Sequence, residues 1–213
     1  MKHEQTRKLT VTAMLAALAF VAVALLRFPV VLFLSYEPKD VIIAFGGFLY
    51  GPLTALAISV VVSLAEMLTI SSTGWIGFVM NVLSSAAFAC TAALVYRKKH
   101  TLTGAAVGLV LGTLAMTALM LLWNYVLTPL YMGTPRADLA ALLVPVFLPF
   151  NLLKGGLNSA IAIYLYRPTV QGLRRINLFP QSAGTPSGAA EKRIVWIAAG
   201  VVLAACVVLL ILL

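Results

Sequence analysis

The chain has 213 residues, of which 62% are hydrophobic and 10% are charged, with a mean hydropathy of +1.04 and a formal net charge of +9. Soluble domains carry roughly 25% charged residues, so this composition excludes a soluble enzyme or binding domain. Uncharged apolar runs long enough to cross a membrane core of about 30 Å recur along the whole length. We therefore predict a single all-α bundle embedded in the lipid bilayer, without a separate catalytic domain.

The first predicted helix covers Leu9–Leu26 and follows a basic flank. A basic flank before an apolar run also begins a signal peptide, but this run is about 18 residues long and an Arg-Phe-Pro sequence follows it without a small-x-small cleavage site. We expect the segment to be retained as a membrane helix. Ala13 and Ala17 are spaced for close packing against another helix, although alanine is also simply common in membrane helices.

Six further apolar segments follow. They are Asp40–Tyr50, Leu53–Ile70, Ile76–Tyr96, Leu102–Thr128, Leu139–Tyr166 and Ile194–Leu213. The first of these is too short to cross a bilayer alone, and Gly51-Pro52 is expected to end it with a sharp turn. Residues 1–170 are thus predicted to form a six-helix membrane domain. Residues 171–193, rich in Pro, Gly, Ser and Ala in the middle, are predicted to be a flexible cytoplasmic linker, and residues 194–213 an additional membrane helix for anchoring or packing.

Basic residues are distributed unevenly between the two sides of this topology. With the N-terminus in the cytoplasm, the inner segments hold eleven lysines and arginines, the outer segments hold three, and Lys154 lies within a membrane segment. Such an excess on the cytoplasmic side predicts a multi-pass protein of the cell membrane with its N-terminus inside. The basic charge is explained by topology and by the anionic inner leaflet, so no nucleic-acid partner is expected.

The residue patterns needed for catalysis are missing from the sequence. It contains no GxxxxGK[ST], GxSxG or HExxH motif. The histidines, His3 and His100, lie in basic flanks, while Cys90 and Cys206 lie in apolar runs, where we expect them to be small packing residues. The sequence therefore predicts a protein that is not an enzyme and has neither a metal site nor a bound cofactor.

The most informative polar residue is Lys154, an ammonium group inside a long apolar segment. Asn151 precedes it by three residues and Asn158 follows it by four, so all three fall on one helical face. A charge at this depth costs at least about 2.5–3.5 kcal/mol on insertion scales and normally faces a cavity or a partner. We expect this face to line a pocket that opens outward, although Asn158 by itself also fits an interhelical hydrogen bond.

Polar residues of other segments reach a similar level on the outer side. The candidates that could share or close the same cavity are Tyr36, Asp40, Glu66, Asn81 and Asn124. Asparagine amides pair well with the donor and acceptor edges of heterocycles, and aromatic and apolar walls cover a planar face. The cavity is therefore expected to hold a mostly neutral molecule by hydrogen bonds.

Each of these residues also has a structural interpretation. Glu66 could pair with Lys154 simply to neutralise a buried charge, and Asn81 could form a hydrogen bond to another helix. Asn124 lies between two aromatic residues and could mark the membrane interface, where aromatic side chains are enriched.

Five blocks of the sequence carry a more specific pattern. They are LTVTAMLAALAFVAVA (9–24), YEPKDVIIAFGGFLYGPLTAL (36–56), NVLSSAAF (81–88), GTLAMTALMLLWNYVLTPLYMG (112–133) and PFNLLKGGLNSAIAIYLYRP (149–168). Together, across about residues 7–170, they resemble the riboflavin-specific substrate-binding subunit, or S component, of energy-coupling factor (ECF) transporters. The resemblance implies a six-helix fold that binds riboflavin from outside as a transported substrate. It also implies association with a membrane coupling protein and two cytoplasmic ATPase subunits.

The resemblance also assigns roles to individual residues. In that family the alanine pattern of the first helix contacts the coupling protein, which carries over to Ala13 and Ala17. The polar ligand contacts come from the end of the fifth helix and from the Asn-x-x-Lys of the sixth, which carry over to Asn124, Asn151 and Lys154.

The first outer loop, Phe33–Asp40, corresponds to a lid over the site in that family, and the helix at 194–213 lies beyond the usual end of such subunits. Two alternatives remain open. One is the same architecture for another vitamin, such as thiamine or a pyridoxal-type compound. The other is a stand-alone membrane enzyme or proton-coupled carrier with Glu66 and Lys154 as a relay, for which the sequence indicates no second acid within the membrane.

Overall fold

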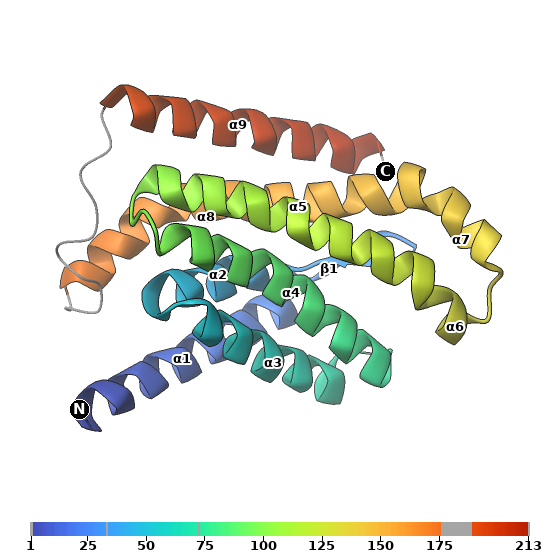
Figure 1. Cartoon of the computed structure of the whole chain (residues 1–213), viewed down its shortest axis with the longest axis horizontal. Coiled ribbons are helices and arrows are strands. Elements are labelled where there is room, and N and C mark those ends of the chain that lie inside the picture. The colour runs from blue at the N-terminus through green and yellow to red at the C-terminus, as the bar shows by residue number, and fades with distance from the viewer. Residues whose placement is uncertain (1, 33, 72, 176–188, 213) are drawn as a thin grey trace.

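The computed structural model describes residues 2–32, 34–71, 73–175 and 189–212, and the structural statements below concern these residues. They form a helical bundle with one short β-hairpin (Figure 1). The long helices are α1 (Lys2–Leu26), α3 (Pro52–Thr69), α4 (Gly74–Tyr96), α5 (Leu102–Val126), α8 (Leu148–Arg175) and α9 (Ala189–Leu212). The short ones are α2 (Lys39–Tyr50), α6 (Thr128–Met132), α7 (Arg136–Leu142) and the π-helical turn η1 (Leu143–Phe147).

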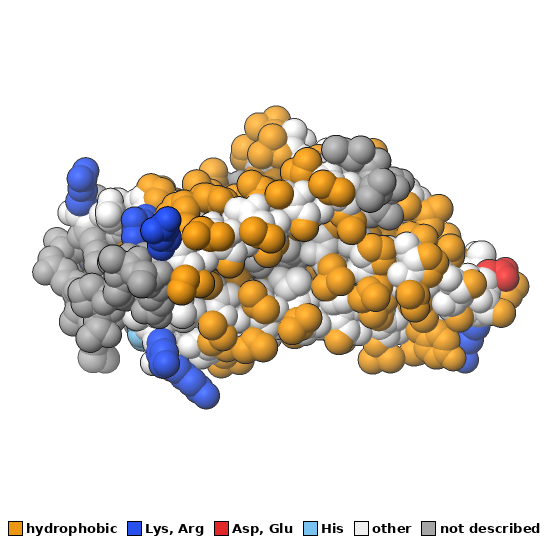
Figure 2. Space-filling view, turned by 90° about the horizontal axis from the view of Figure 1, so that it is seen from above, with side chains coloured by type: hydrophobic (Ala, Val, Ile, Leu, Met, Phe, Trp, Pro, Cys, Tyr) orange, Lys and Arg blue, Asp and Glu red, His pale blue; other side chains and the backbone are white. Residues whose placement is uncertain are grey.

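The bundle has two distinct ends and two distinct sides. Helix α9 runs along one side, over α8 and α5, whereas α1 and α3 lie on the opposite side (Figure 1). We call the end with α6 and α7, toward which β1 points, the hairpin end. We call the opposite end the basic end, because lysine and arginine side chains gather there while hydrophobic side chains cover the middle of the molecule (Figure 2).

The lengths of the helices agree with a membrane protein. Five are long and apolar enough to cross a bilayer, namely Glu4–Leu26, Pro52–Thr69, Gly74–Tyr96, Leu102–Val126 and Arg136–Leu173. Two apolar helices of the described residues are shorter than these five. They are α2, which has 12 residues, and the apolar part of α9, Arg193–Leu209. The predicted helical membrane bundle is confirmed. The number of helices that cross the membrane, six plus one, stays a prediction.

The break predicted between the second and third helices is confirmed. Helix α2 ends at Tyr50. The next residue, Gly51, has a φ of +91°, a conformation that glycine adopts easily, and Pro52 is the first residue of α3. The two helices are therefore separate elements that still pack on each other. Because α2 is short, its first residues lie inside the bundle at the hairpin end rather than at the surface.

A β-hairpin connects α1 to α2, where only a loop was expected. Strands β1 (Phe28–Val31) and β2 (Leu34–Tyr36) pair antiparallel, and the rings of Phe28 and Tyr36 lie 5.2 Å apart across the pair. These strands are too short to give a clear alternating pattern in the sequence. Only Glu37 and Pro38 separate the hairpin from the start of α2.

The last helix of the predicted membrane domain is longer and less regular than expected. Pro145 lies in the π-helical turn η1, where the missing N–H and the bulk of the ring disrupt the ordinary helical ladder. At the other end, α8 continues through Pro168 to Arg175 rather than ending at Tyr166, so the linker was predicted to begin too early. Residues 176–188 of that predicted linker lie outside the described residues.

Small residues hold the basic half of the bundle together. A Cβ atom added to Gly108 would lie 2.7 Å from the carbonyl oxygen of Ala92, and one added to Gly112 would lie 2.4 Å from that of Phe88. Helices α4 and α5 therefore touch backbone to backbone, as small residues allow in membrane proteins. A hydrogen bond of 2.9 Å between the hydroxyls of Tyr96 and Tyr166 joins α4 to α8 nearby.

Candidate functional site

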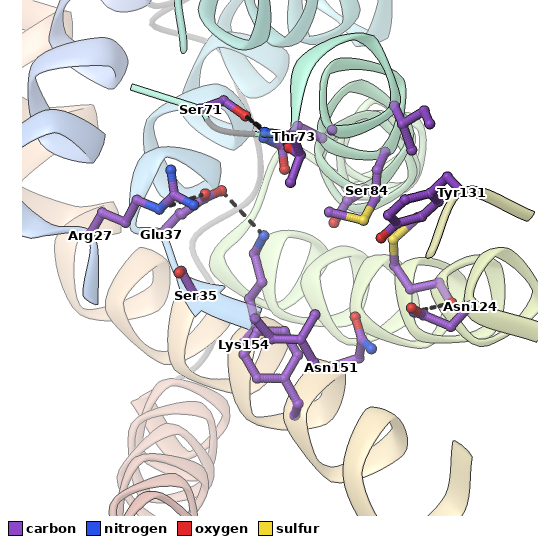
Figure 3. Close-up of a pocket in the computed structure, with 17 residues that line it drawn as sticks. Arg27, Ser35, Glu37, Ser71, Thr73, Ser84, Asn124, Tyr131, Asn151 and Lys154 are labelled. Carbon is purple, nitrogen blue, oxygen red and sulfur yellow. Dashed lines mark hydrogen bonds and ion pairs between the residues drawn. The ribbon is translucent and has the colours of Figure 1, made fainter. Parts of the chain in front are cut away.

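A small pocket lies at the hairpin end between the hairpin, the α3–α4 connection and helices α4, α5, α6 and α8 (Figure 3). Its polar lining includes Arg27, Glu37, Asn81, Asn124, Asn151 and Lys154, and its apolar lining includes Ile76, Met80, Met120 and Phe150. Its volume is about 60 Å³. Pockets for drug-sized ligands measure about 300–1,000 Å³, so this site must widen to hold one.

Helix α8 contributes the two residues on which the sequence analysis concentrated. Asn151 and Lys154 both line the pocket and are both buried. The amide nitrogen of Asn151 donates to the carbonyl of Phe147, 2.7 Å away in η1, so the π-helical turn helps to fix the orientation of this side chain. Figure 3 shows the lysine side chain reaching across the pocket toward Glu37.

Asn158 lies on the same face of α8 but does not line the pocket. Four residues beyond Lys154, it is about 6 Å farther along the helix axis, below the pocket. Its side-chain oxygen accepts a hydrogen bond of 2.8 Å from the hydroxyl of Tyr36, and its nitrogen donates to Asp40 and to the carbonyl of Glu37, 3.4 Å away in each case. Asn158 thus joins α8 to the hairpin and to α2.

The pocket also receives one asparagine from α4 and one from α5. Asn124 donates through its amide nitrogen to the carbonyl of Met120 at 2.7 Å and accepts from the hydroxyl of Thr128 at 3.1 Å. Asn81 donates to a carboxylate oxygen of Glu66 at 3.1 Å. Both amides are therefore held in place from behind while they line the pocket.

Six ionisable side chains form a charge cluster behind and along the pocket wall. They are the cations Arg27, Lys39 and Lys154 and the carboxylates Glu37, Asp40 and Glu66. Opposite charges are equal in number, so the cluster is neutral as a whole. Such balance makes the burial of several charges within a membrane bundle tolerable, because each charge has partners of opposite sign.

Lys39 is the centre of this cluster. Its ammonium group lies 2.6 Å from Glu66 and 2.9 Å from Glu37, and its side chain is fully buried. Lys39 is one of the three basic residues assigned to the outer segments, yet its side chain is buried, because α2 begins inside the bundle. The alternative that Glu66 neutralises Lys154 is wrong: Glu66 pairs with Lys39, and the ion-pair partners of Lys154 are Glu37 and Asp40, at 3.6 and 3.7 Å.

Three of the predicted site residues lie behind the pocket wall. Glu66 binds Lys39, Asp40 accepts a hydrogen bond of 2.5 Å from the hydroxyl of Ser85, and Tyr36 contacts α8 through Asn158. None of the three lines the pocket among the described residues. They connect the lining side chains to the rest of the bundle.

Glu37 was expected only as part of the loop over the cavity, and the structure shows that its side chain lines the pocket. It follows strand β2, where successive side chains point to opposite sides, so its neighbour Tyr36 faces α8 while Glu37 faces the pocket. The alternation could have indicated this choice, but only once the strand was known. Arg27, Ser84 and Tyr131 also line the pocket without having been predicted, because their positions depend on how the segments pack.

Glu37 lies in the connection between the hairpin and α2, and its ionised form is strongly favoured over the protonated acid. Burial alone would raise its pKa, but the neighbouring ammonium groups of Lys39 and Lys154 outweigh burial and lower the pKa from 4.5 to about 2. The group therefore remains charged over the whole physiological range. Its negative charge is a fixed part of the pocket wall.

The charge cluster corrects one argument against the proton-relay alternative. That alternative was set aside because the sequence indicated no second acid near Lys154, yet Glu37 and Asp40 both lie within 3.7 Å of its ammonium group. These acids are nevertheless held in ion pairs and hydrogen bonds, as are the other members of the cluster. The arrangement is that of a neutral, ion-paired pocket wall.

The sequence is similar to those of known transport proteins. Residues 7–166 match the family described as "ECF transporter, substrate-specific component". The riboflavin transporter RibU of Staphylococcus aureus (strain TCH60) is 32% identical over 182 residues, covering 81% of this chain and 95% of the relative. The riboflavin transporter FmnP of Bacillus subtilis (strain 168) is 34% identical over 163 residues, covering 71% and 85%.

A solved structure has a similar fold. The S component of a bacterial ECF transporter superposes with a TM-score of 0.68 at 31% sequence identity, covering 80% of this chain and 99% of that one. The matched region contains the hairpin, the pocket and the charge cluster, whereas α9 lies beyond it. The chain is a multi-pass membrane protein that belongs to the family of substrate-specific components of ECF transporters, which are transport subunits and not enzymes.

Proposed function

We propose that this protein binds riboflavin in the pocket at the hairpin end and delivers it for uptake. The observation that carries the proposal is the convergence of Asn81, Asn124, Asn151 and Lys154 from three helices on one pocket. Three amides and one ammonium group suit a neutral heterocycle with a polar side chain, while the methionine and phenylalanine side chains of the lining can cover a planar ring. The names of the two relatives support riboflavin over thiamine or a pyridoxal-type vitamin.

Each lining residue has a role that follows from its position. Lys154 and Asn151 would hydrogen-bond the flavin ring or the ribityl hydroxyls, and Asn124 would recognise a polar edge from the facing helix. Asn81 would contribute from α4. Glu66, Tyr36 and Asp40 would act indirectly, by holding the lysines, the hairpin and Asn158 in place.

Entry of the ligand requires the pocket to widen. The hairpin and Glu37 cover one side of it, so we expect this segment to move as a lid, in line with the expectation for Phe33–Asp40; residue 33 itself lies outside the described residues. The ion pairs of Lys154 are long, at 3.6 and 3.7 Å. A ligand oxygen can therefore take over part of the coordination of this ammonium group without leaving a carboxylate unpaired, because Glu37 also binds Lys39.

The proposed orientation puts the N-terminus and the basic end in the cytoplasm and the hairpin end outside. The burial of Lys39 sharpens the charge asymmetry, since it removes one of the three outer basic residues from the surface. An uncharged substrate moved against a gradient requires an energy source, and this chain has no ATPase motif. We therefore propose uptake together with a membrane coupling protein and two cytoplasmic ATPase subunits.

Helix α1 is the proposed contact surface for the coupling protein. Ala13 and Ala17 are exposed on its outer face, whereas Ala16 and Ala19 are buried against the bundle. Exposed small residues at four-residue spacing let another helix approach closely in lipid. The exposed pair is thus available to a partner.

Riboflavin fluorescence gives the direct test of binding. Purified protein should quench the fluorescence of riboflavin saturably, and an excess of thiamine or pyridoxal should not displace it. A sample that shows no saturable quenching at micromolar riboflavin would refute the proposed ligand. Displacement by one of the other vitamins would identify that vitamin as the substrate instead.

The docking surface has its own test. Ala17→Leu should leave riboflavin affinity unchanged, within about twofold, and strongly reduce uptake by cells that contain the coupling module. The matched control is Ala204→Leu, because Ala204 is exposed on α9, on the opposite side of the bundle. Normal uptake by Ala17→Leu, or weakened binding in the purified variant, would contradict the assignment of this surface.

A further inference from the structure

Helix α9 lies outside residues 7–166, which match the family. It packs closely against α8 but not against α5. Against α8 the contact is tight: the rings of Tyr164 and Trp196 lie 4.9 Å apart, and a Cβ atom added to Gly156 would lie 2.9 Å from the sulfur of Cys206. Toward α5 a groove of about 510 Å³ remains open. Its floor is α8, and its two walls are α5 and α9.

The groove is lined almost entirely by apolar side chains. Val107, Val110 and Leu114 come from α5, and Ile194 and Val202 come from α9. Of the polar lining residues, Thr113 donates to the carbonyl of Leu109 at 3.0 Å and lies 3.1 Å from the hydroxyl of Ser159. These hydroxyls are satisfied within the protein, so the groove suits a hydrocarbon chain rather than a polar ligand.

The dimensions of the groove match one leaflet of a bilayer. Along α5 its lining extends from Thr103 to Leu114. Eleven residue steps at about 1.5 Å each give a length of about 16 Å, which is close to half of a hydrocarbon core of about 30 Å. On α8 the lining covers a similar length, from Leu152 to Ile163. An acyl chain lying parallel to these helices would therefore fill the groove from the membrane surface to the midplane.

One end of the groove lies at the basic end of the bundle. Thr103 and Ile194 line it there, and Arg193 directly precedes Ile194 and is exposed. Lys99 and Arg167 are also exposed at this end, and the guanidinium of Arg167 lies over the ring of Trp196 on α9, 5.7 Å from its centre. Figure 2 shows the gathering of basic side chains at this end. Such a cluster beside a membrane surface attracts anionic headgroups.

We propose that the groove binds one acyl chain of an anionic glycerophospholipid, whose phosphate lies at Arg193 and the neighbouring basic residues. The site is a property of this chain rather than of the matched family region, because α9 supplies one of its walls. It goes beyond riboflavin binding and is on another side of α8 from the pocket. The assignment of this lipid to the cytoplasmic leaflet rests on the proposed orientation of the protein, and the groove itself does not.

Native mass spectrometry of the purified full chain without riboflavin tests the proposal, with phosphatidylglycerol and phosphatidylcholine as probes. The wild type should retain one phosphatidylglycerol in preference to phosphatidylcholine. Ala198→Trp fills the groove from α9 and should reduce that complex at least about fivefold. The matched control Ala204→Trp places the same ring on an exposed position of α9 outside the groove and should retain the lipid.

Two further variants keep the test decisive. Val110→Trp fills the groove from α5, so it should have the same effect as Ala198→Trp without altering α9. Arg193→Gln should reduce the preference for phosphatidylglycerol while leaving the phosphatidylcholine complex in place. Thermal unfolding in detergent confirms that each variant is folded. The proposal would be overturned if both groove-filling variants retained as much lipid as the wild type. It would also be overturned if Ala204→Trp lost as much lipid as the groove-filling variants. Neither result would contradict the proposal that the protein binds riboflavin.

Discussion

The hairpin half and the basic half of the bundle are stabilised in different ways. At the hairpin end, segments distant in sequence meet through ion pairs and hydrogen bonds, as in the contacts of Lys39 with Glu37 and Glu66. In the basic half, α4 and α5 meet backbone to backbone at Gly108 and Gly112. The pocket lies in the first half, where polar side chains surround unfilled space.

This difference supports the placement of the proposed binding site in the hairpin half. A polar contact can be exchanged for a contact with a ligand, because an ammonium or amide group is satisfied by either partner. Close backbone packing through glycine cannot be exchanged in this way, since any movement loses dispersion contacts without replacement. The ion-paired half can therefore open and close around a substrate while the glycine-packed half keeps the helices in place.

The largest expected effect comes from Lys154→Met, which removes the only pocket-lining ammonium of the described residues. Riboflavin affinity should fall at least about tenfold. The protein should also become less stable, because Glu37 and Asp40 lose a cation within the bundle. Fluorescence titration and thermal unfolding measure the two effects.

A second substitution separates these two effects of Lys154→Met. Adding Asp40→Asn restores the charge balance of the cluster, so the double variant should recover thermal stability but not affinity. Lys98→Met, at an exposed position of the basic end, is the matched control and should change neither. Recovery of affinity in the double variant would show that the lysine serves only to neutralise carboxylates.

Gly112→Ala tests the glycine-packed half. The added methyl group would lie 2.4 Å from the carbonyl oxygen of Phe88, so α4 and α5 must move apart. Overpacking of about 1–3 kcal/mol in a chain of this size should lower the Tm by roughly 2–10 °C. The affinity of the folded fraction for riboflavin should stay within about twofold of the wild type.

The control for this prediction is Gly172→Ala, where an added Cβ atom has no neighbour within 4 Å. Its Tm should remain at the wild-type value. If Gly112→Ala instead weakened binding without a change in Tm, the proposed division between a rigid half and an adaptable half would be wrong.

Glu37→Gln should have the smallest effect and a distinctive pH dependence. Because the folded-state pKa of Glu37 is lowered from 4.5 to about 2, its stabilising contribution is fully present above pH 4.5 and is lost as the pH falls toward 2. The variant should melt several degrees below the wild type at pH 7, by a constant margin down to about pH 5, and the two curves should converge in more acidic solution.

Thermal unfolding in detergent at a series of pH values measures this difference. Glu4→Gln, at an exposed position of α1, is the control and should follow the wild type throughout. A difference between wild type and Glu37→Gln that disappeared between pH 6 and pH 8 would contradict the low pKa.

Several features of the fold follow directly from the sequence. The apolar runs predict membrane helices because a bilayer requires continuous apolar segments, and Gly51-Pro52 predicts the break between α2 and α3 because of local backbone chemistry. The hairpin and the continuation of α8 through Pro168 were not predicted. Short strands depend on their pairing partner, and a helix can continue through a proline when the surrounding packing supports it.

The sequence by itself determined that Lys154, Asn151 and Asn124 are exceptional, since a polar side chain in a membrane segment requires a partner wherever the segment packs. Only the tertiary structure decided which partner each one has. In the structure, Glu66 forms an ion pair with Lys39, and Lys154 forms ion pairs with Glu37 and Asp40. Asn158 lies below the pocket and binds Tyr36. Ion pairing depends on distances of a few ångströms between segments far apart in the chain, and those distances exist only after the helices have packed.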